Sequence, residues 1–152
     1  MVYSISVQTL IMLMEQVNQA MGHDKISVNM QQNCLLLIPA AEKVLAILFI
    51  NLLRNAFIYT RQGVISITID DRQVSISDTG IGMTQQQLEH VFEPFYRAHA
   101  DSNGHGLGLT IVTQLCNRYG WKLKIRSKQG EGTRITVVFP KARRLGGKVE
   151  NN

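Results

Sequence analysis

Residues 40–60 read AAEKVLAILFINLLRNAFIYT, a run of good helix formers that predicts one long helix. The run is apolar nearly all round from Val44 to Ile50, which is typical of a helix buried inside a domain. Two asparagines, Asn51 and Asn55, nevertheless lie within it. A buried helix has to pack against other elements, so the flanking sequence is expected to supply a sheet and further helices.

The residues before this helix predict one more helix and two strands. Apolar side chains recur at i, i+3, i+4, i+7 and i+11 from Leu10 to Met21, an amphipathic stripe that predicts a helix ending near Gly22. Alternating apolar residues and then the run CLLLIP predict two short strands between residues 26 and 38. Pro39 ends the second of them.

The residues after the helix predict two hairpins with two helices between them. In order, these are strands at VISITID (64–70) and VSISD (74–78) joined at Asp71-Arg72, a short helix at TQQQLEHVF (84–92), a helix from Leu107 to Tyr119 closed by Gly120, and strands at 121–127 and 133–139. This order of elements predicts an α+β fold. We expect a two-layer α/β sandwich with a mixed, mostly antiparallel sheet and helices on one face.

Length and charge indicate one globular domain with a basic end. The 152 residues are 45% hydrophobic and 18% charged, enough to bury a core without disulfides or a structural metal. The net charge is +5, and residues 141–152 supply +3 of it, which leaves the rest near neutral. We therefore expect a domain over residues 1–140 and a basic, disordered tail over 141–152. A nucleic-acid-binding domain relying on that tail is a minor alternative.

A second basic cluster has the pattern of a strand. Lys122, Lys124, Arg126 and Lys128 occupy alternate positions, which is the period of a strand with one solvated face. We interpret the cluster as a solvated sheet face rather than a binding patch.

The cysteines and the apolar runs indicate a soluble chain in a reducing compartment. Cys34 and Cys116 have no CxxC spacing, so we expect buried structural thiols and a cytoplasmic location. The sequence has no signal peptide and no run of 18 apolar residues, so no membrane contact by these residues is expected.

The two asparagines of residues 40–60 mark the first candidate site. Asn51 and Asn55 are four residues apart, so their side chains leave one face of the helix, and Tyr59 continues that line. Uncharged amides in an apolar helix destabilise it unless they find partners. Either a polar ligand lies against this face, or the two amides cap local backbone groups.

The next motif is DTGIGM (78–83), at the end of a strand that appears buried by its pattern. The Asp78 carboxylate can accept a hydrogen bond from an exocyclic amine, and Gly80 and Gly82 let a flat ring approach the backbone. The alternative is a tight turn. Downstream, FEPFYR (92–97) offers a hydrophobic latch and an arginine fork for phosphate, and the long polar stretch RAHADSNGHG (97–106) is typical of a functional lid.

GHGLGL (104–109) places three glycines directly before a helix. Free backbone amides and the positive end of the helix dipole favour a phosphate there. The stretch is neither a P-loop, since it lacks GxxxxGK[ST], nor the dinucleotide fingerprint GxGxxG.

Together, NLLRNAFIYT, DTGIGM, FEPFYR and GHGLGLTIV resemble, in this order, the N, first glycine, phenylalanine and second glycine boxes of the histidine kinase ATP-binding domain. The resemblance covers about residues 5–140 and includes a GEGT turn (130–133). It implies the Bergerat-type fold shared by gyrase, mismatch-repair and heat-shock chaperone ATPase domains, with ATP and Mg²⁺ as ligands.

The resemblance also implies roles for single residues. Asn55 would bind Mg²⁺, Asn51 would lie beside the phosphates, Tyr59 would pack on adenine, and Asp78 would accept the adenine amino hydrogen. Phe92 and Phe95 would anchor the lid, Arg97 would reach the γ-phosphate, and Thr133 would join the adenine site through water. The whole implied set is catalytic Asn55 and Arg97, metal-binding Asn55, and nucleotide-binding Asn51, Asn55, Tyr59, Asp78, Gly80, Gly82, Met83, Phe95, Gly104, His105, Gly106, Leu107, Gly108, Leu109 and Thr133. Ile58 departs from the family, which often has a lysine there.

None of the four histidines has the context of the family's phosphorylated histidine. His23-Asp24 follows Gly22 at a helix end, ahead of a strand, and His90, His99 and His105 lie in the predicted lid. We therefore expect a kinase domain that does not autophosphorylate alone. Its partners would be an upstream dimerisation and histidine phosphotransfer hairpin and a response regulator, in a parent sensor of the inner membrane. The alternative is a free-standing serine kinase of the anti-sigma type.

Overall fold

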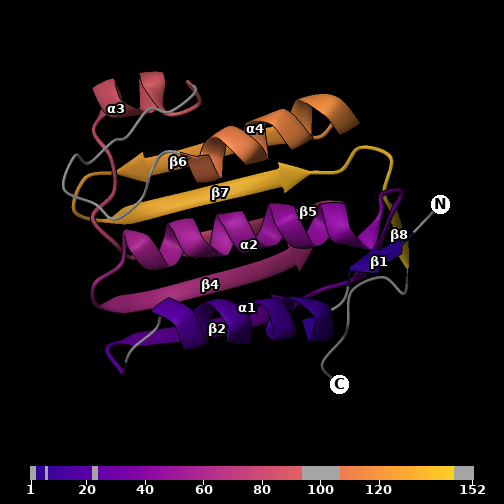
Figure 1. Ribbon diagram of the computed structural model, residues 1–152, viewed down its shortest axis with the longest axis horizontal. Helices are drawn as coiled ribbons and strands as arrows, with labels where there is room; N and C mark the ends of the chain where they lie inside the picture. The colour runs from indigo at the N-terminus through magenta and orange to yellow at the C-terminus, as the bar shows by residue number, and fades with distance from the viewer. Residues whose placement is uncertain (1–2, 6, 22–23, 94–106, 146–152) are drawn as a thin grey trace.

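The computed structural model of the chain describes residues 3–5, 7–21, 24–93 and 107–145. The helices α1 (Val7–Met21), α2 (Glu42–Ile58) and α4 (Leu107–Tyr119) lie side by side over one face of a sheet (Figure 1). α2 lies in the middle and contacts both neighbours, which explains why its sequence is apolar nearly all round. The predicted two-layer sandwich is confirmed.

Five strands form the main sheet, in the order β2-β4-β5-β7-β6. Their bounds are Ile26–Gln32 for β2, Gly63–Asp70 for β4, Gln73–Asp78 for β5, Lys122–Lys128 for β6 and Gly132–Val138 for β7. β2 and β4 are parallel, and the other neighbours are antiparallel. The sheet is therefore mixed and mostly antiparallel, as predicted.

The β4–β5 hairpin turns at Asp71 and Arg72, whose φ angles of 47° and 55° are those of a type I′ turn. This turn fixes the register, so that Ile67 lies opposite Ile76 and Ile69 opposite Val74. These four side chains are buried in the core with α2.

A second, three-stranded sheet was not predicted. It has the order β1-β3-β8, with β1 at Tyr3–Ile5, β3 at Leu35–Ile38 and β8 at Arg143–Leu145. The two strands expected between residues 26 and 38 both exist, but they belong to different sheets.

β8 lies within residues 141–152, the segment expected to be a disordered tail. Its backbone pairs with β3, and Ala142 just before it is buried. The Arg72 Nε donates to the Ala142 carbonyl at 3.1 Å, and Arg144 pairs with Asp71 at 3.7 Å. The described part of this segment is thus ordered by the open edge of β3, which charge composition does not reveal. Residues 146–152 lie outside the described residues.

The core continues from the sheet into the helix layer. Phe139 contacts Trp121 edge-on at 4.9 Å between ring centroids, and Phe49 at 6.3 Å. Cys34 and Cys116 are buried free thiols, as predicted, and burial raises the pKa of Cys116 to about 11. Of the helices in the described ranges, none is long and apolar enough to cross a membrane.

Candidate functional site

The sequence motifs converge on one end of the sandwich. β5 ends there at Asp78, α2 ends at Ile58, and α4 begins at Leu107, on the left in Figure 1. The turn between β6 and β7 lies at the same end. Segments far apart in the chain therefore bring their polar residues to one place.

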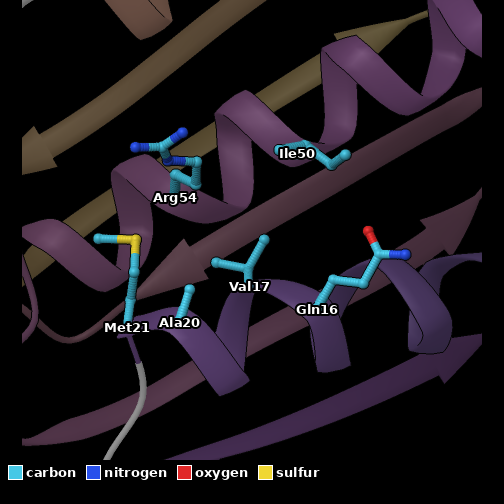
Figure 2. Close-up of a pocket in the computed structure, with 6 residues that line it drawn as sticks. All are labelled: Gln16, Val17, Ala20, Met21, Ile50 and Arg54. Carbon is cyan, nitrogen blue, oxygen red and sulfur yellow. The ribbon is translucent and has the colours of Figure 1, made fainter.

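Asn51 and Asn55 lie on the side of α2 that faces α4. Ile50 and Arg54 of α2 line a pocket between α1 and α2, together with residues of α1 (Figure 2). Successive residues are 100° apart on a helix, so Asn51 and Asn55 each lie 100° around α2 from Ile50 and Arg54, toward α4. None of the predicted site residues lines the pocket of Figure 2, so it is not the candidate site.

The two asparagines differ in their partners. The Asn51 Nδ2 donates to the Ile47 carbonyl at 2.7 Å, which is the local cap considered above, and its Oδ1 keeps its acceptor capacity. No hydrogen bond from a described residue is made to the half-buried Asn55 side chain. The Asn55 amide is therefore the one available to an external polar group.

Asp78 is the buried carboxylate of the site, with an exposed fraction of 8%. Its Oδ1 accepts hydrogen bonds from the Gly80 N–H at 2.9 Å and the Thr133 N–H at 3.3 Å. Burial raises the pKa of Asp78 to about 6, and these two backbone donors oppose the rise. Within the described ranges no cation pairs with it, and no hydrogen bond is made to its Oδ2.

The segment after Asp78 is held between α2 and the β6–β7 turn. The Ile81 N–H donates to the Tyr59 carbonyl at 3.0 Å, and the Gly130 N–H donates to the Ile81 carbonyl at 2.8 Å. A Cβ at Gly80 would lie 2.0 Å from the Tyr59 carbonyl oxygen. In this structure Gly80 therefore permits a close approach between two protein segments.

Gly82 has a related constraint. Its φ is +67°, and a Cβ there would lie 2.1 Å from the Lys128 carbonyl oxygen. The two glycines of DTGIGM thus allow close backbone packing, which agrees with the alternative interpretation of this motif as a tight turn. The same packing fixes the segment relative to Asp78.

Ser127 joins the site, although the sequence analysis did not select it. The Met83 N–H donates to the Ser127 Oγ at 2.8 Å, and that hydroxyl donates to the Gly132 carbonyl at 3.0 Å. The Ser127 and Thr133 hydroxyls are 2.8 Å apart, and the two residues are register partners. With its one proton on the Gly132 carbonyl, Ser127 has to accept from Thr133, which leaves the Thr133 oxygen free to accept another hydrogen bond.

A signal for Ser127 was present in the sequence. It is the polar residue that interrupts the apolar positions of β6, on the face opposite the four cations. Its partners, however, come from residue 83 and residues 132–133, so only the folded chain identifies them.

The segment that leads toward the lid motif is a capped short helix. Thr84 and Gln87 form a capping box at the start of α3 (Gln85–His90). Phe92 is half-buried, and exposed His90 pairs with Glu93 at 2.9 Å, which raises the pKa of His90. The predicted site residues Phe95, Arg97, Gly104, His105 and Gly106 lie outside the described residues.

The predicted phosphate end of the site begins at α4. Leu107 and Gly108 form its first turn, as predicted, and Leu109 packs against the core. Thr133, the last predicted site residue, is buried beside Asp78. The structure thus brings Asn51, Asn55, Tyr59, Asp78, Gly80, Gly82, Met83, Thr133 and the start of α4 to one end of the domain.

The side-chain oxygens at this end of the domain fit a magnesium ion that is also bound by waters and substrate phosphates. Among the residues that the structure describes, no group of three His, Cys, Asp or Glu side chains could hold a metal. Mg²⁺ is commonly bound through one or two protein oxygens together with waters and substrate phosphates. The Asn55 side-chain oxygen, Oδ1, which has no protein partner in the described ranges, is such a ligand.

Comparison with known proteins agrees with this geometry. The model of the family described as histidine kinase-, DNA gyrase B- and HSP90-like ATPases matches residues 40–143. The sensor histidine kinase YkoH of Bacillus subtilis is 37% identical over 112 residues, 68% of this chain and 24% of that protein. The sensor histidine kinase RppB of Synechocystis is 35% identical over 99 residues, 59% of this chain and 22% of that protein. The chain thus spans about a quarter of the length of these relatives.

Solved structures have the same fold. The mycobacterial sensor histidine kinase MprB superposes with a TM-score of 0.78 at 24% identity, over 95% of this chain and all of that chain. Full-length ShkA, solved in complex with AMPPNP, superposes with a TM-score of 0.76 at 26% identity, over 91% of this chain and 31% of that chain.

Proposed function

The chain belongs to the histidine kinase-, DNA gyrase B- and HSP90-like ATPase family, and on this premise we propose that it binds Mg-ATP and donates the γ-phosphate to a histidine outside this sequence. The acceptor nitrogen would form a bond to the γ-phosphorus while the bond to the β–γ bridging oxygen breaks, so that ADP leaves. Such a transfer needs little covalent chemistry from the protein. The domain has to bind and orient the nucleotide and to neutralise the charge of its phosphates.

Asp78 is the observation that carries the proposal. It is a buried carboxylate that forms no salt bridge in the described ranges, and both of its hydrogen bonds fall on one oxygen. Burying a carboxylate in this way disfavours its charged form, so the arrangement lowers stability unless a donor arrives. The exocyclic amine of adenine is a donor of the required kind, and Oδ2 would accept from it.

The surroundings of Asp78 suit a flat base. Thr133 presents a hydroxyl oxygen beside the carboxylate, and the Gly80–Met83 segment is held by backbone contacts on both sides. A preorganised site of this kind loses little entropy when the ligand binds. Tyr59, at the C-terminal cap of α2, would pack against the ring.

Asn55 and the start of α4 would hold the phosphate end. Asn55 supplies a hard oxygen ligand for Mg²⁺, and Asn51 lies one turn before it. The first N–H groups of a helix have no acceptor within the helix, so the start of α4 would favour a phosphate. Arg97 and the Gly104 to Gly108 amides would complete the neutralisation, with Arg97 acting on the γ-phosphate in the transfer.

We place this domain in a two-component sensor kinase of the inner membrane. The acceptor histidine would lie on an upstream dimerisation hairpin, and a response regulator would receive the phosphate next. Residues 1–140 would form the catalytic unit, extended in the folded chain by β8. The matched relatives named sensor histidine kinases favour this parent over a free-standing serine kinase.

The test is calorimetric binding of ATP to the purified chain with and without Mg²⁺. We expect Mg-ATP to bind and to raise the melting temperature, since a ligand of the native state stabilises it by mass action. Asn55→Ala should remove most of the magnesium dependence, whereas Asn29→Ala, on an exposed position of β2, should keep it. Equal magnesium dependence in both variants would remove Asn55 from the metal site, and no ATP binding by the unmodified chain would refute the function.

A further inference from the structure

The face of the sheet opposite the helices carries a set of exposed cations. On β6, Lys124 and Arg126 alternate with half-buried residues, and Arg134 of β7 is exposed on the same face. The sequence pattern alone favours a solvated face. The structure adds three observations about these side chains.

The first observation is that these cations lack acidic partners. The salt bridges of the described residues join Lys128 to Glu131, Arg72 and Arg144 to Asp71, and His90 to Glu93. Lys124, Arg126 and Arg134 take part in none of them. Three positive charges on one face therefore have no salt-bridge partner within the described part of the chain.

The second observation is the register of β6 and β7. Arg126 lies directly opposite Arg134, and Lys124 lies opposite Thr136. Like charges directly opposite each other in an antiparallel pair destabilise the sheet. A solvated face without a ligand gains nothing from placing two arginines at one register position.

The third observation is a hollow in the surface at this point. A depression of about 310 Å³ is lined by Gln73, Lys124, Arg126, Arg134 and Thr136. We call it the cationic depression. The Thr136 hydroxyl is hydrogen-bonded to the Ser75 hydroxyl at 2.8 Å, and both residues are buried, so this part of the lining is fixed.

We propose that the cationic depression binds a small phosphorylated molecule with two or more negative charges. The two guanidinium groups offer planar forks that match phosphate oxygens, and Lys124 adds a third charge. Gln73 and Thr136 supply neutral polar groups that orient the ligand.

The lining favours a small molecule over a macromolecular partner. Its volume falls at the lower end of the range for small-molecule pockets. Protein interfaces are built around an apolar, aromatic centre, and no apolar side chain lines this depression. The proposal does not depend on nucleotide binding at Asp78. Arg126 and Arg134 also line a neighbouring hollow together with Asp78 and Thr133, so the experiment has to keep the Asp78 end occupied.

The experiment uses inorganic pyrophosphate as the probe, with the chain first saturated with ADP and Mg²⁺ so that the Asp78 end is occupied. Thermal unfolding is measured at constant ionic strength, with chloride as the reference anion. We expect pyrophosphate to raise the melting temperature of the unmodified chain. Arg134→Gln should weaken pyrophosphate binding about tenfold or more, since a charge-assisted bidentate contact is lost.

A second readout separates this proposal from simple screening. Without pyrophosphate, Arg134→Gln should melt at a higher temperature than the unmodified chain, because the repulsion from Arg126 is removed. Arg54→Gln, an exposed arginine of α2, is the matched control and should leave pyrophosphate binding unchanged. Amide NMR shifts on adding pyrophosphate should fall at residues 124, 126, 134 and 136.

Three results would overturn the proposal. Equal stabilisation of the Arg134→Gln variant and the unmodified chain by pyrophosphate would show that the depression is not the site. Amide shifts confined to residues 78–83 and 107–109 would place the anion at the Asp78 end instead. Tighter binding of a hexaglutamate peptide than of pyrophosphate would favour an acidic protein segment as the occupant.

Discussion

Two aspartates at opposite ends of the β4–β5 hairpin have opposite environments. Asp71 lies in the turn, exposed, and its carboxylate is 3.9 Å from Arg72 and 3.7 Å from Arg144. Asp78 ends β5, is buried, and is bonded only by backbone N–H groups in the described ranges. One hairpin thus holds an exposed carboxylate that pairs with two arginines, and a buried carboxylate that forms no salt bridge in the described ranges.

The difference shows what marks a functional acid in this fold. Exposed ion pairs such as those of Asp71 contribute about 0–1 kcal/mol to the free energy of unfolding, so Asp71 is a surface residue of a turn. Burial raises the pKa of Asp78 to about 6, which means that its charged form is disfavoured in the folded chain. A group retained despite such a cost is a candidate for function.

The largest expected effect comes from exchanging each carboxylate for an amide. Asp78→Asn should weaken ATP binding by about 100-fold or more, because a donor amide meets the donor amine of adenine and a misdirected buried polar contact costs about 3 kcal/mol. Asp71→Asn should leave ATP binding unchanged. Calorimetry on both variants, with circular dichroism to check the fold, tests the contrast; equal affinities for ATP would erase it.

The second prediction concerns the free energy of unfolding and pH. In the folded chain the pKa of Asp78 is raised from 3.8 to about 6. The protonated Asp78 therefore contributes its full stabilisation of the folded chain below about pH 4, and this stabilisation is lost as pH rises through 6. Asp78→Asn cannot ionise, so at pH 7 it should be more stable than the unmodified chain by about 2–3 kcal/mol, from 1.36 kcal/mol per pKa unit.

Urea denaturation at several pH values checks this second prediction. The stability gap between Asp78→Asn and the unmodified chain should narrow as pH falls through 6 and close below about pH 4. Adenosine, which has no phosphates that titrate in this range, should also bind the unmodified chain more weakly below pH 6. A gap that does not change with pH would mean that Asp78 ionises normally and that the contrast with Asp71 is false.

The third prediction concerns the hydrogen bonds that hold the residues around Asp78 in place. Ser127→Ala should weaken ATP binding about tenfold, since the hydroxyl that joins Met83, Gly132 and Thr133 is lost and each such bond contributes about 1 kcal/mol. The ratio of ATP to GTP affinity should fall as well, because Thr133 and the Gly80–Met83 segment would face the base in the proposed complex. Binding of inorganic tripolyphosphate should not change.

The control for this third prediction is Ser66→Ala, a half-buried serine of β4. It should leave both ATP and GTP affinities as they are. Parallel losses of ATP, GTP and tripolyphosphate affinity in Ser127→Ala would indicate general loosening of the fold, and Ser127 would then have no positioning role.

The smallest expected effect is on the free energy of unfolding, and it comes from substituting the turn residue Asp71. Asp71→Asn should change the free energy of unfolding by less than about 0.5 kcal/mol, because asparagine also adopts the positive φ of 47° and only exposed ion pairs are lost. Raising the salt concentration should reduce the difference further. A loss of several kcal/mol would show that the pairing of β8 depends on this carboxylate.

The local patterns of the sequence were reliable for single elements. The apolar run of residues 40–60, the stripe before Gly22 and the alternating strands of both hairpins are all confirmed with ends close to those expected. The motif DTGIGM was also enough to select Asp78 as the central acid. These features depend on neighbours within a few residues, which is the range over which period and propensity act.

Pairings between distant residues could not be predicted in the same way. β3 separates from β2 and pairs with β1 and β8, so that residues 143–145 form an edge strand where charge had indicated a tail. Ser127 is hydrogen-bonded to Met83, which is 44 positions away in the chain, and to Gly132 and Thr133 on the next strand. Arg126 lies opposite Arg134 because of the register of the β6–β7 hairpin.

The sequence therefore predicted the helices and every strand except β1 and β8, and it proposed side chains for a nucleotide site. The tertiary structure was needed to show that Asp78 is buried and forms no salt bridge in the described ranges, and that three cations line one hollow on the other face. The physical reason is that pKa and ion pairing depend on burial and on neighbours in space. Those neighbours come from strands and helices that are distant in the chain.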